Sequence, residues 1–388
     1  MTILDSARKP GAKILVSGGS RCNVTNIAVS ERDFWGGRPA IVRRILRGFP
    51  VHETISFFRE LGVTLHEEAD GKLFPDTNRA QTVLDALLRE TTRLGATLLS
   101  AQRVIDVVPE DAGFRVVTGH GDLRAANVVL ATGGQSLPKT GSDGGGYDIA
   151  RRLGHTIVPP APALVPLLLD EHDDFHRGLS GVSHEVEIAV WIDGAIATRL
   201  TGALLWTHFG VSGPVALNAS RHWTRAHIEQ RAVRLTMSFH PGSSFDDEDA
   251  RWVDRARDQP KTTIQSMLAE RLPASVAAAI ANHLRIDGSL PLAHLSREQR
   301  RALAHAMTAW PLPVAGTRGY NFAEVTSGGV PLDEIDPATM ASRVRRGLCL
   351  VGEILDVDGR IGGFNFQWAW STGFAAGRAL GGGSSPPD

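Results

Sequence analysis

The stretch Gly347–Gly377 reads GLCLVGEILDVDGRIGGFNFQWAWSTGFAAG and indicates how the chain folds. Its first residues, Gly347–Gly352, form a short apolar run of the kind found in buried strands. A glycine-rich loop at 359–365, GRIGGFN, follows and leads into a helix. A helix N-terminus behind glycines favours an anion or a carbonyl oxygen, because its first N–H groups have no partner within the helix. The stretch predicts a strand, a ligand-facing turn and a helix.

Two other segments repeat this pattern. Lys13–Asn26, KILVSGGSRCNVTN, starts apolar like a strand and breaks into a loop in which Gly18 and Gly19 let backbone N–H groups approach a flat or anionic ligand, with Arg21 near a charge. Ala131–Gly134, ATGG, ends the apolar run before it in the same way. A tight turn explains either segment taken alone. Together the three segments predict one ligand site, because ligands of open α/β sheets bind at the carboxyl ends of strands.

Length and composition narrow the class of protein. A chain of 388 residues exceeds what one compact core holds in most folds, so we expect two domains. The net charge of −1 argues against nucleic acid or an anionic membrane as the main partner. No apolar run approaches the roughly 20 residues that span a bilayer, and residues 1–13 lack a signal-peptide pattern. The two cysteines, Cys22 and Cys349, are too few for a disulfide framework, and a reducing cytoplasm fits this number best.

The order of predicted elements is that of an α/β fold. Apolar residues recur at helical spacing over 39–62 and over Arg79–Gly95. The expected strands are the hairpin Val63–Glu67 and Lys72–Phe74, and the runs Thr97–Val108, Gly113–Thr118 and Leu123–Leu130.

A change of composition near Val158 predicts a domain boundary. The proline-rich VPPAPALVPL at 158–167 excludes a regular helix. Beyond it, Val186–Ile192 and Ala195–Leu200 flank an Asp193-Gly194 hairpin turn, and residues 245–310 are mostly helical in pattern. We therefore predict a discontinuous first domain at 1–160 and 319–388, with a β-rich plus helical domain inserted at 161–318.

The sequence does not fit the motifs of several other kinds of catalytic or metal-binding site. The G-x-S-x-G of a nucleophile elbow is absent around Ser212 and Ser20. DVDGRIGGFNFQ resembles a calcium loop but has Arg360 at its fifth position and ends in Gln367, so we predict no metal site. His208, beside flexible glycines, is the one candidate catalytic residue, although a structural histidine is the more frequent outcome. Cys22 has no C-x-x-C partner and is expected to be a buried thiol.

Taken together, these segments resemble the HI0933-like flavoproteins, also known as the aminoacetone oxidase family of FAD-binding enzymes. The matching blocks cover nearly the whole chain, with less detail from 220 to 310. They are LDSARKPGAKILVSGGSRCNVTN, VVLATGG, KTGSDGGGYDIARRLGH, GALLWTHFGVSGP, AEVTSGGVPLDEIDPATMASR and the closing block at 347–377. The resemblance implies a Rossmann-like FAD domain of the two-dinucleotide-binding type, with the inserted domain supplying the substrate side.

The resemblance also implies roles for single residues. Asp5 would end the second strand and bond the ribose hydroxyls of adenosine, and Val104 would offer backbone groups to the adenine. Arg8 and Lys13 would lie near the phosphates, and Thr132 and Gly133 would pack on the cofactor. The positions implied for the inner half of FAD are Ser17, Gly18, Gly19, Arg21, Asn23, Gly352, Glu353, Gly362, Gly363 and Asn365.

One part of the family pattern is missing from this sequence. A strand, a G-x-G-x-x-G turn and a helix, together about 30 residues, would precede Asp5 in the family. No other segment replaces them, because Gly141–Gly146 reads GSDGGG and fails at its third position. We expect either a start misplaced within a longer protein, which we favour, or a true truncation, and we expect a chain that begins at Met1 to retain little FAD.

The predicted function is that of an FAD-dependent oxidoreductase. The flavin would take a hydride or two electrons from a small-molecule substrate, or from NAD(P)H, and pass them on. The alternative is a non-catalytic or inactive flavin- or nucleotide-binding protein. An RNA-associated protein that uses Arg43, Arg44 and Arg47 is disfavoured by the balanced charge. The sequence leaves the substrate, the electron acceptor and the oligomeric state open.

Overall fold

The computed structural model describes residues 1–173 and 175–382 and divides into two compact units. The first unit comprises Met1–Pro162 with Tyr320–Asp388, and the second comprises Ala163–Gly319. Among the described residues, no helix has both the length and the apolar character that crossing a bilayer requires.

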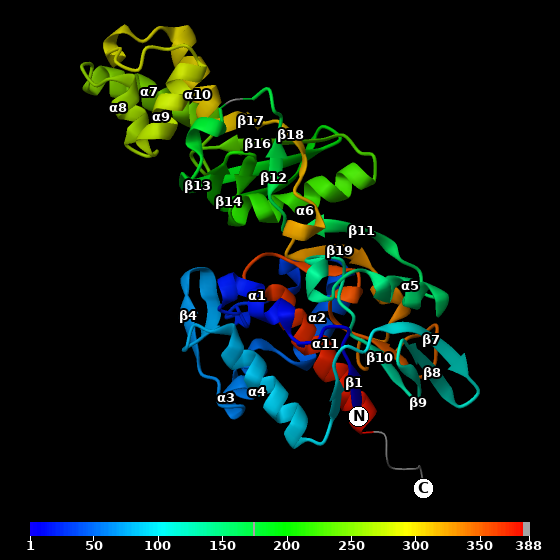
Figure 1. The fold of residues 1–388 in the computed structure, drawn as a ribbon. Helices are drawn as coiled ribbons and strands as arrows, with labels where there is room; N and C mark the ends of the chain where they lie inside the picture. The colour runs from blue at the N-terminus through cyan, green and yellow to red at the C-terminus, as the bar shows by residue number, and fades with distance from the viewer. Residues whose placement is uncertain (174, 383–388) are drawn as a thin grey trace. The chain divides into compact units, whose positions relative to one another are not determined.

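The first unit contains two parallel strand pairs. β1 (Thr2–Leu4) pairs with β6 (Thr97–Leu99), and β10 (Val128–Leu130) pairs with β20 (Leu348–Leu350). Figure 1 labels one strand of each pair, β1 and β10. All four are short runs of mostly β-branched and leucine residues, as expected for strands between packed layers. Helix α4 (Ala80–Arg93) leads into β6, and its buried face includes Val83 and Leu84.

The strand predicted at the start of Lys13–Asn26 is wrong. These residues belong to α1 (Ala12–Ser20), in which Ser17, Gly18 and Gly19 depart from helical geometry. Ile14 and Leu15 pack on the buried cluster that contains Val83 of α4. A short apolar run does not distinguish a strand from a buried helical turn, and here packing on α4 decides for the helix. Only two of the three glycine-bearing segments therefore follow a strand.

Most other predicted elements of the first unit are confirmed with shifted ends. The helix expected over 39–62 is two helices, because Pro50 interrupts it. The hairpin and the run Gly113–Thr118 form where expected, but the runs Thr97–Val108 and Leu123–Leu130 are each divided into two strands of different sheets, with breaks at 100–103 and 126–127. The bounds are α2 (Pro39–Gly48), α3 (Val51–Glu60), β2 (Thr25–Asn26), β3 (Phe34–Gly36), β4 (Leu65–Glu68), β5 (Lys72–Pro75), β7 (Val104–Glu110), β8 (Gly113–Thr118), β9 (Gly121–Ala125), α5 (Gly145–Arg152), β11 (Val158–Ala163), β19 (Val325–Gly329) and β21 (Val357–Gly359).

Helix α11 (Phe364–Gly381) follows the loop of the opening stretch, as predicted. Its Phe364 and Trp368 are buried in a cluster with Leu130 of β10 and Leu350 of β20. The Trp368 Nε1–H donates to the carbonyl of Gly352 at 3.1 Å. The helix is therefore tied to β10, to β20 and to the residue Gly352 that follows β20.

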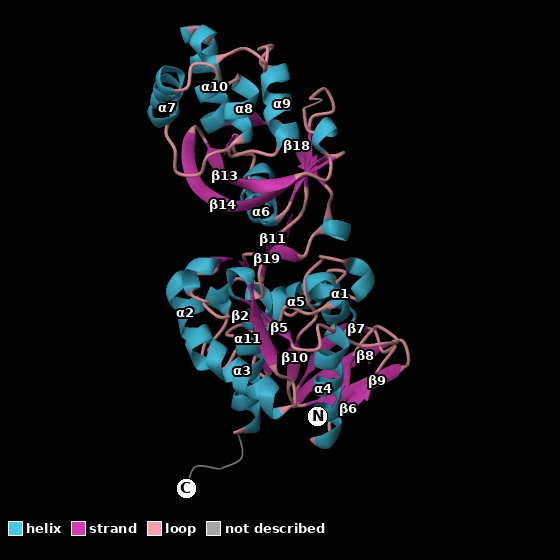
Figure 2. Cartoon of the chain, turned by 90° about the vertical axis from the view of Figure 1, so that its left-hand side faces the viewer, coloured by secondary structure: helices cyan, strands magenta, loops and turns pink. Residues whose placement is uncertain are grey.

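The second unit is built on a seven-stranded antiparallel sheet in the order β17-β16-β13-β14-β15-β12-β18. The hairpin predicted at Asp193-Gly194 is confirmed by β13 and β14, and the helical region predicted at 245–310 is confirmed by four helices (Figure 2). The bounds are β12 (Leu167–Leu169), β13 (Ser183–Ile192), β14 (Ala195–Thr207), β15 (Gly210–Ser212), α6 (Pro214–Ile228), β16 (Val233–Ser238), α7 (Phe245–Asp258), α8 (Ile264–Ala269), α9 (Ala274–His283), α10 (Arg297–Ala309), β17 (Trp310–Leu312) and β18 (Val314–Thr317).

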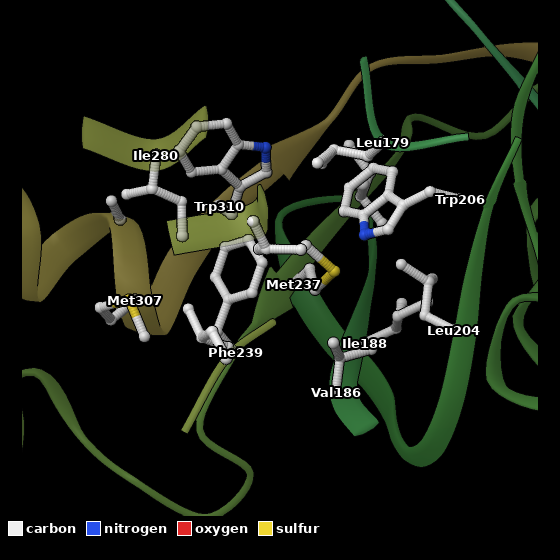
Figure 3. Close-up of a cluster of buried hydrophobic side chains, with 14 of the residues drawn as sticks. Leu179, Val186, Ile188, Leu204, Trp206, Met237, Phe239, Ile280, Met307 and Trp310 are labelled. Carbon is white, nitrogen blue, oxygen red and sulfur yellow. The ribbon is translucent and has the colours of Figure 1, made fainter. Parts of the chain in front are cut away.

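One apolar core joins the sheet and the helices of this unit. Figure 3 shows Trp206 and Met237 from strands in the same cluster as Ile280 of α9 and Met307 of α10. Each of these side chains is almost fully buried. Helices and sheet therefore share one hydrophobic core, which is the usual condition for a unit that folds together.

Candidate cofactor site

A cavity of about 310 Å³ opens in the first unit at the carboxyl ends of β1 and β10. Its wall is made by the residues after β1, the start of α1, the segment before β7, the residues after β10, and the loop that leads into α5. This is the edge of a parallel sheet at which α/β proteins bind their ligands.

Five residues named from the sequence line this cavity. They are Asp5, Lys13, Val104, Thr132 and Gly133. One carboxylate oxygen of Asp5, Oδ1, accepts a hydrogen bond from the Ala7 N–H at 2.8 Å, which orients the side chain just after β1 ends. The cavity therefore gathers a carboxylate, an ammonium and a hydroxyl side chain around a backbone-lined floor.

Two glycines allow two segments of the cavity wall to pack closely against each other. A Cβ at Gly133, where φ is +70°, would lie 2.5 Å from the Ser142 Oγ. A Cβ at Gly146 would lie 1.9 Å from the Thr132 Oγ1. Any side chain at either position would force its neighbour to move, so these glycines let the start of α5 approach the end of β10.

A polar network connects Lys13 to Glu353. The Lys13 ammonium donates to the Ser136 Oγ at 2.7 Å and forms an ion pair with the Glu353 carboxylate. The other Glu353 oxygen accepts from the Ser136 hydroxyl and from the Thr326 N–H, both at 2.8 Å. Glu353 thus lies beside the Ala131–Gly134 segment, where a Cβ on Gly134 would approach its Oε1 to 2.9 Å.

The loop at 17–23 meets the loop at 359–365 in a second place. In the orientation that satisfies its neighbours, the Asn23 amide accepts from the Gly363 N–H at 3.1 Å and donates to the Thr25 carbonyl at 2.8 Å. The Asn26 amide donates to the Gly362 carbonyl at 3.2 Å. Gly18 and Gly19 both have left-handed φ, as their loop requires. These residues lie together, but they do not line the 310 Å³ cavity.

Several other candidates are engaged elsewhere. Arg21 pairs with Glu68 at 2.6 Å and lies over the Phe74 ring, so its charge belongs to the β4–β5 hairpin. The Asn365 amide bonds both backbone groups of Gly359, at 2.8 and 2.9 Å. The backbone N–H of Gly352 donates to the Thr372 Oγ1 at 3.0 Å.

Three further candidates have other surroundings. The Ser17 hydroxyl donates to the Ile14 carbonyl at 2.7 Å, within α1. Arg8 is exposed and is not part of the cavity wall. His208, in the second unit, is an exposed residue in the turn between β14 and β15.

The buried thiol of Cys22 follows the glycine loop. Its side chain is fully buried, and burial raises the pKa of the thiol to about 11 despite a hydrogen bond with Ser17. A thiol of this kind is protonated at neutral pH and is a poor nucleophile. The expectation of a buried thiol is confirmed.

The cavity wall also contains residues that the sequence did not assign. The most informative are Arg103, Ser142, Asp143 and Gly146. Arg103 and Asp143 form an ion pair at 2.6 Å. Burial of Asp143 acts to raise the pKa of its carboxyl, but hydrogen bonds from Arg103 and from the Gly145 N–H, together with the charge of Arg103, outweigh burial and lower this pKa. The only signal for this loop was the block KTGSDGGG, in which no phosphate-binding pattern was complete.

These residues fit part of a dinucleotide cofactor. The Ser142 Oγ is buried and has no hydrogen-bond partner within the described residues, as expected of a group whose partner is a ligand. Asp5 at a strand end is suited to ribose hydroxyls, and Lys13 is suited to a phosphate.

Comparison with known proteins agrees with this arrangement. The chain matches the HI0933-like protein Rossmann domain over residues 1–379. It is 32% identical to the 3-dehydro-bile acid delta(4,6)-reductase of Clostridium scindens over 97% of this chain and 91% of that protein. It is 33% identical to the ribosomal RNA dihydrouridine synthase of Haemophilus influenzae and 32% identical to that of Escherichia coli, with the same coverage. The chain therefore belongs to the HI0933-like family of FAD-dependent oxidoreductases.

Proposed function

We propose that this chain is an FAD-dependent reductase of a small molecule that carries a carbon–carbon double bond next to a carbonyl group. The observation that carries the proposal is the cavity at the ends of β1 and β10, with Asp5, Lys13 and Thr132 in its wall. A pocket built from strand ends and glycine-bearing turns is the usual place for a dinucleotide.

The names of the relatives support the reductive direction. One is a delta(4,6)-reductase of a 3-dehydro-bile acid, and two are dihydrouridine synthases. The first name describes the reduction of double bonds at positions 4 and 6 of a compound with a 3-oxo group, and the second describes the addition of two hydrogens to uridine. In each case the reduced group is conjugated with a carbonyl. The two classes of substrate differ greatly in size, so what they share is the reacting group.

The residues of the chain would then bind the cofactor and hold it in a fixed orientation. When bound, FAD supplies two-electron chemistry, accepting a hydride from a donor such as NAD(P)H and passing it to the acceptor. Asp5 accepts hydrogen bonds from the ribose, and Lys13 offers positive charge beside the phosphates. A proton must also reach the carbon next to the carbonyl.

The test uses the full chain with added FAD. We would mix it with NADPH and, in separate anaerobic reactions, with a 3-oxo-4-ene steroid or with uridine-containing RNA. We expect NADPH consumption and a product heavier by two hydrogens with the steroid. Reduction of RNA alone would overturn the small-molecule part of the proposal. This outcome would also contradict the expectation, drawn from net charge, that nucleic acid is not a partner.

The alternative of a non-catalytic flavin-binding protein predicts a different result. FAD would bind, and NADPH would be consumed with neither acceptor, or only when oxygen is admitted. A failure to bind FAD at any concentration would overturn the proposal, because the proposed reaction depends on FAD.

A further inference from the structure

Glu324 is a glutamate that the assignments above do not use, and it differs from the residues on either side of it. It directly precedes β19 (Val325–Gly329), a strand in which every residue is buried, and it follows Ala323, which is also buried. Glu324 itself is exposed. A charged side chain within a buried run reaches water or a ligand, so its surroundings decide what it can do.

The segment that carries Glu324 is fixed against the loop after β10. The Thr326 Oγ1 accepts hydrogen bonds from the backbone N–H groups of Gln135 and Ser136, at 2.7 and 3.0 Å. The Ser136 hydroxyl also lies 3.3 Å from the carbonyl oxygen of Glu324. These contacts hold Glu324 beside the residues that follow Ala131–Gly134.

Lys13 and Glu353 are the charged residues of this cluster. The Lys13 ammonium bonds the Ser136 Oγ and pairs with Glu353. Glu353 also accepts from the Ser136 hydroxyl and from the Thr326 N–H. Donors therefore hold Glu353 as a carboxylate, whereas no donor among residues 1–173 and 175–382 bonds the Glu324 carboxyl.

The surroundings of the Glu324 side chain favour a protonated carboxyl. The side chain is exposed, yet the protein around it displaces enough water to raise the pKa of the carboxyl. The charge of Lys13 opposes this rise without cancelling it. Glu324 therefore keeps its proton to a higher pH than a glutamate on an open surface, and Lys13 would stabilise the carboxylate that a proton transfer leaves behind.

Glu324 lies at the end of the candidate site where the reaction is expected. The sequence resemblance implies that Glu353 faces the inner half of FAD, and that Asp5 and Val104 face the adenosine. The Ser136 hydroxyl contacts both Glu353 and the carbonyl of Glu324, so the two glutamates belong to the same end of the site.

We propose that Glu324 is the acid that protonates the carbon next to the carbonyl of the substrate. This inference rests on the proposed function, which leaves the source of that proton open. The far carbon of the double bond receives the hydride that NAD(P)H supplies, and the π electrons shift to give an enolate. The near carbon then forms its C–H bond with the proton of Glu324, whose O–H bond breaks. The carboxylate regains a proton from water, so the substrate has gained two hydrogens and the chain is unchanged.

The first measurement needs neither cofactor nor substrate. Infrared spectra of the full chain at about pH 6, where exposed glutamates are ionised, should contain the carbonyl band of a protonated carboxyl. We expect Glu324→Gln to remove this band. Glu67→Gln, at an exposed position of β4, is the matched control and should retain it. A wild-type chain without the band would overturn the inference, because Glu324 would then have no proton to give.

The second measurement separates the two halves of the reaction. The FAD-loaded chain is mixed anaerobically with NADPH and then with a 3-oxo-4-ene steroid. We expect Glu324→Gln to take electrons from NADPH at the wild-type rate and to reduce the steroid about 100-fold more slowly, as the loss of a general acid predicts. The wild-type rate of steroid reduction should fall as the pH rises through the pKa of Glu324. Glu324→Asp, which keeps an acid, should retain this pH dependence, and Glu324→Gln should not.

The outcomes distinguish the inference from the proposed function. If Glu324→Gln reduces the steroid at the wild-type rate, the inference alone is wrong. Equal slowing of both halves would indicate a structural role and would also overturn the inference alone. A wild-type chain that binds no FAD, or that takes electrons from NADPH and passes them to no steroid, would overturn the proposed function and the inference with it.

Discussion

The Lys13 ammonium and the Glu353 carboxylate form an ion pair across 340 positions of sequence. Their side chains are 30% and 16% exposed, so the pair is largely shielded from water. The Glu353 oxygens also accept from Ser136 and Thr326. The pair therefore links α1, the loop after β10 and the segment after β20 at the edge of the candidate site.

We expect Lys13→Met and Glu353→Gln each to lower the free energy of unfolding by about 1–3 kcal/mol, because each leaves a shielded group without its partner. The double variant should lose less than the sum of the two, since neither charge is then stranded. Urea unfolding measures all three variants, with Lys9→Met at an exposed position as the control. Strictly additive losses would show that the two groups do not interact in solution.

Gly363 is the N-cap of α11, with φ of +93°, and a Cβ there would lie 2.5 Å from the Thr25 backbone. We expect Gly363→Ala to destabilise the fold by about 2 kcal/mol or more through strain and the backbone clash. Gly373→Ala, in the middle of the same helix with open space around it, should instead stabilise by roughly 0.5–1 kcal/mol. Thermal unfolding compares the two, and an equal effect of both substitutions would contradict the role given to Gly363.

The hydrogen bonds that Glu334 accepts from His155 and Thr156 predict that the stability of the fold depends on pH. Burial acts to raise the pKa of Glu334, but hydrogen bonds from Thr156 and His155 outweigh it and lower the pKa of the folded carboxyl. The stability that this provides is present above the unfolded pKa, about 4.3, and is lost as the pH falls through the folded value.

We expect Glu334→Gln to flatten the loss of unfolding free energy in this acid range. Urea unfolding across the acid range measures this loss. Glu60→Gln, at an exposed position, is the control and should retain the slope of the wild type. A wild-type slope in Glu334→Gln would show that other carboxyls carry the dependence.

The thiol of Cys22 should be inert in the folded chain. Burial raises its pKa to about 11 from 9.0, which alone lowers the thiolate fraction about 100-fold. In a Cys349→Ala background, a chromogenic thiol reagent should modify Cys22 at least about 100-fold more slowly in buffer than in urea. Rapid modification in buffer would mean that the loop around Ser17 opens readily.

Substitution of Asp5 tests whether the candidate site binds the adenosine half of FAD. We expect Asp5→Ala to weaken FAD about tenfold or more, because the ribose loses a charged acceptor. Reductase activity measured at saturating FAD should be close to that of the wild type, since Asp5 binds the cofactor and does not react. A loss of activity that added FAD does not restore would contradict a purely binding role.

Local patterns were sufficient for most elements of the fold. The apolar runs before Ala131–Gly134 and after Gly347 are strands β10 and β20, and the Asp193-Gly194 turn joins β13 and β14. Pattern failed at Lys13–Val16, where a short apolar run is helical because Ile14 and Leu15 pack on α4. That contact lies some seventy residues further along the chain, where no rule of local periodicity reaches.

The amino-acid order by itself determined the class of fold, the family and the glycine-bearing turns, because turn chemistry and strand periodicity depend on residues that are close along the chain. Only the tertiary structure decided which of these turns meet. It placed Asp5, Lys13, Thr132 and Gly133 around one cavity, brought Asn23 to Gly363, and turned Arg21 toward Glu68. It also brought Ser142 to the cavity through the contact of Gly146 with Thr132. Such contacts depend on how whole strands and helices pack. The distances between segments that are remote in sequence cannot be inferred from any local stretch of residues.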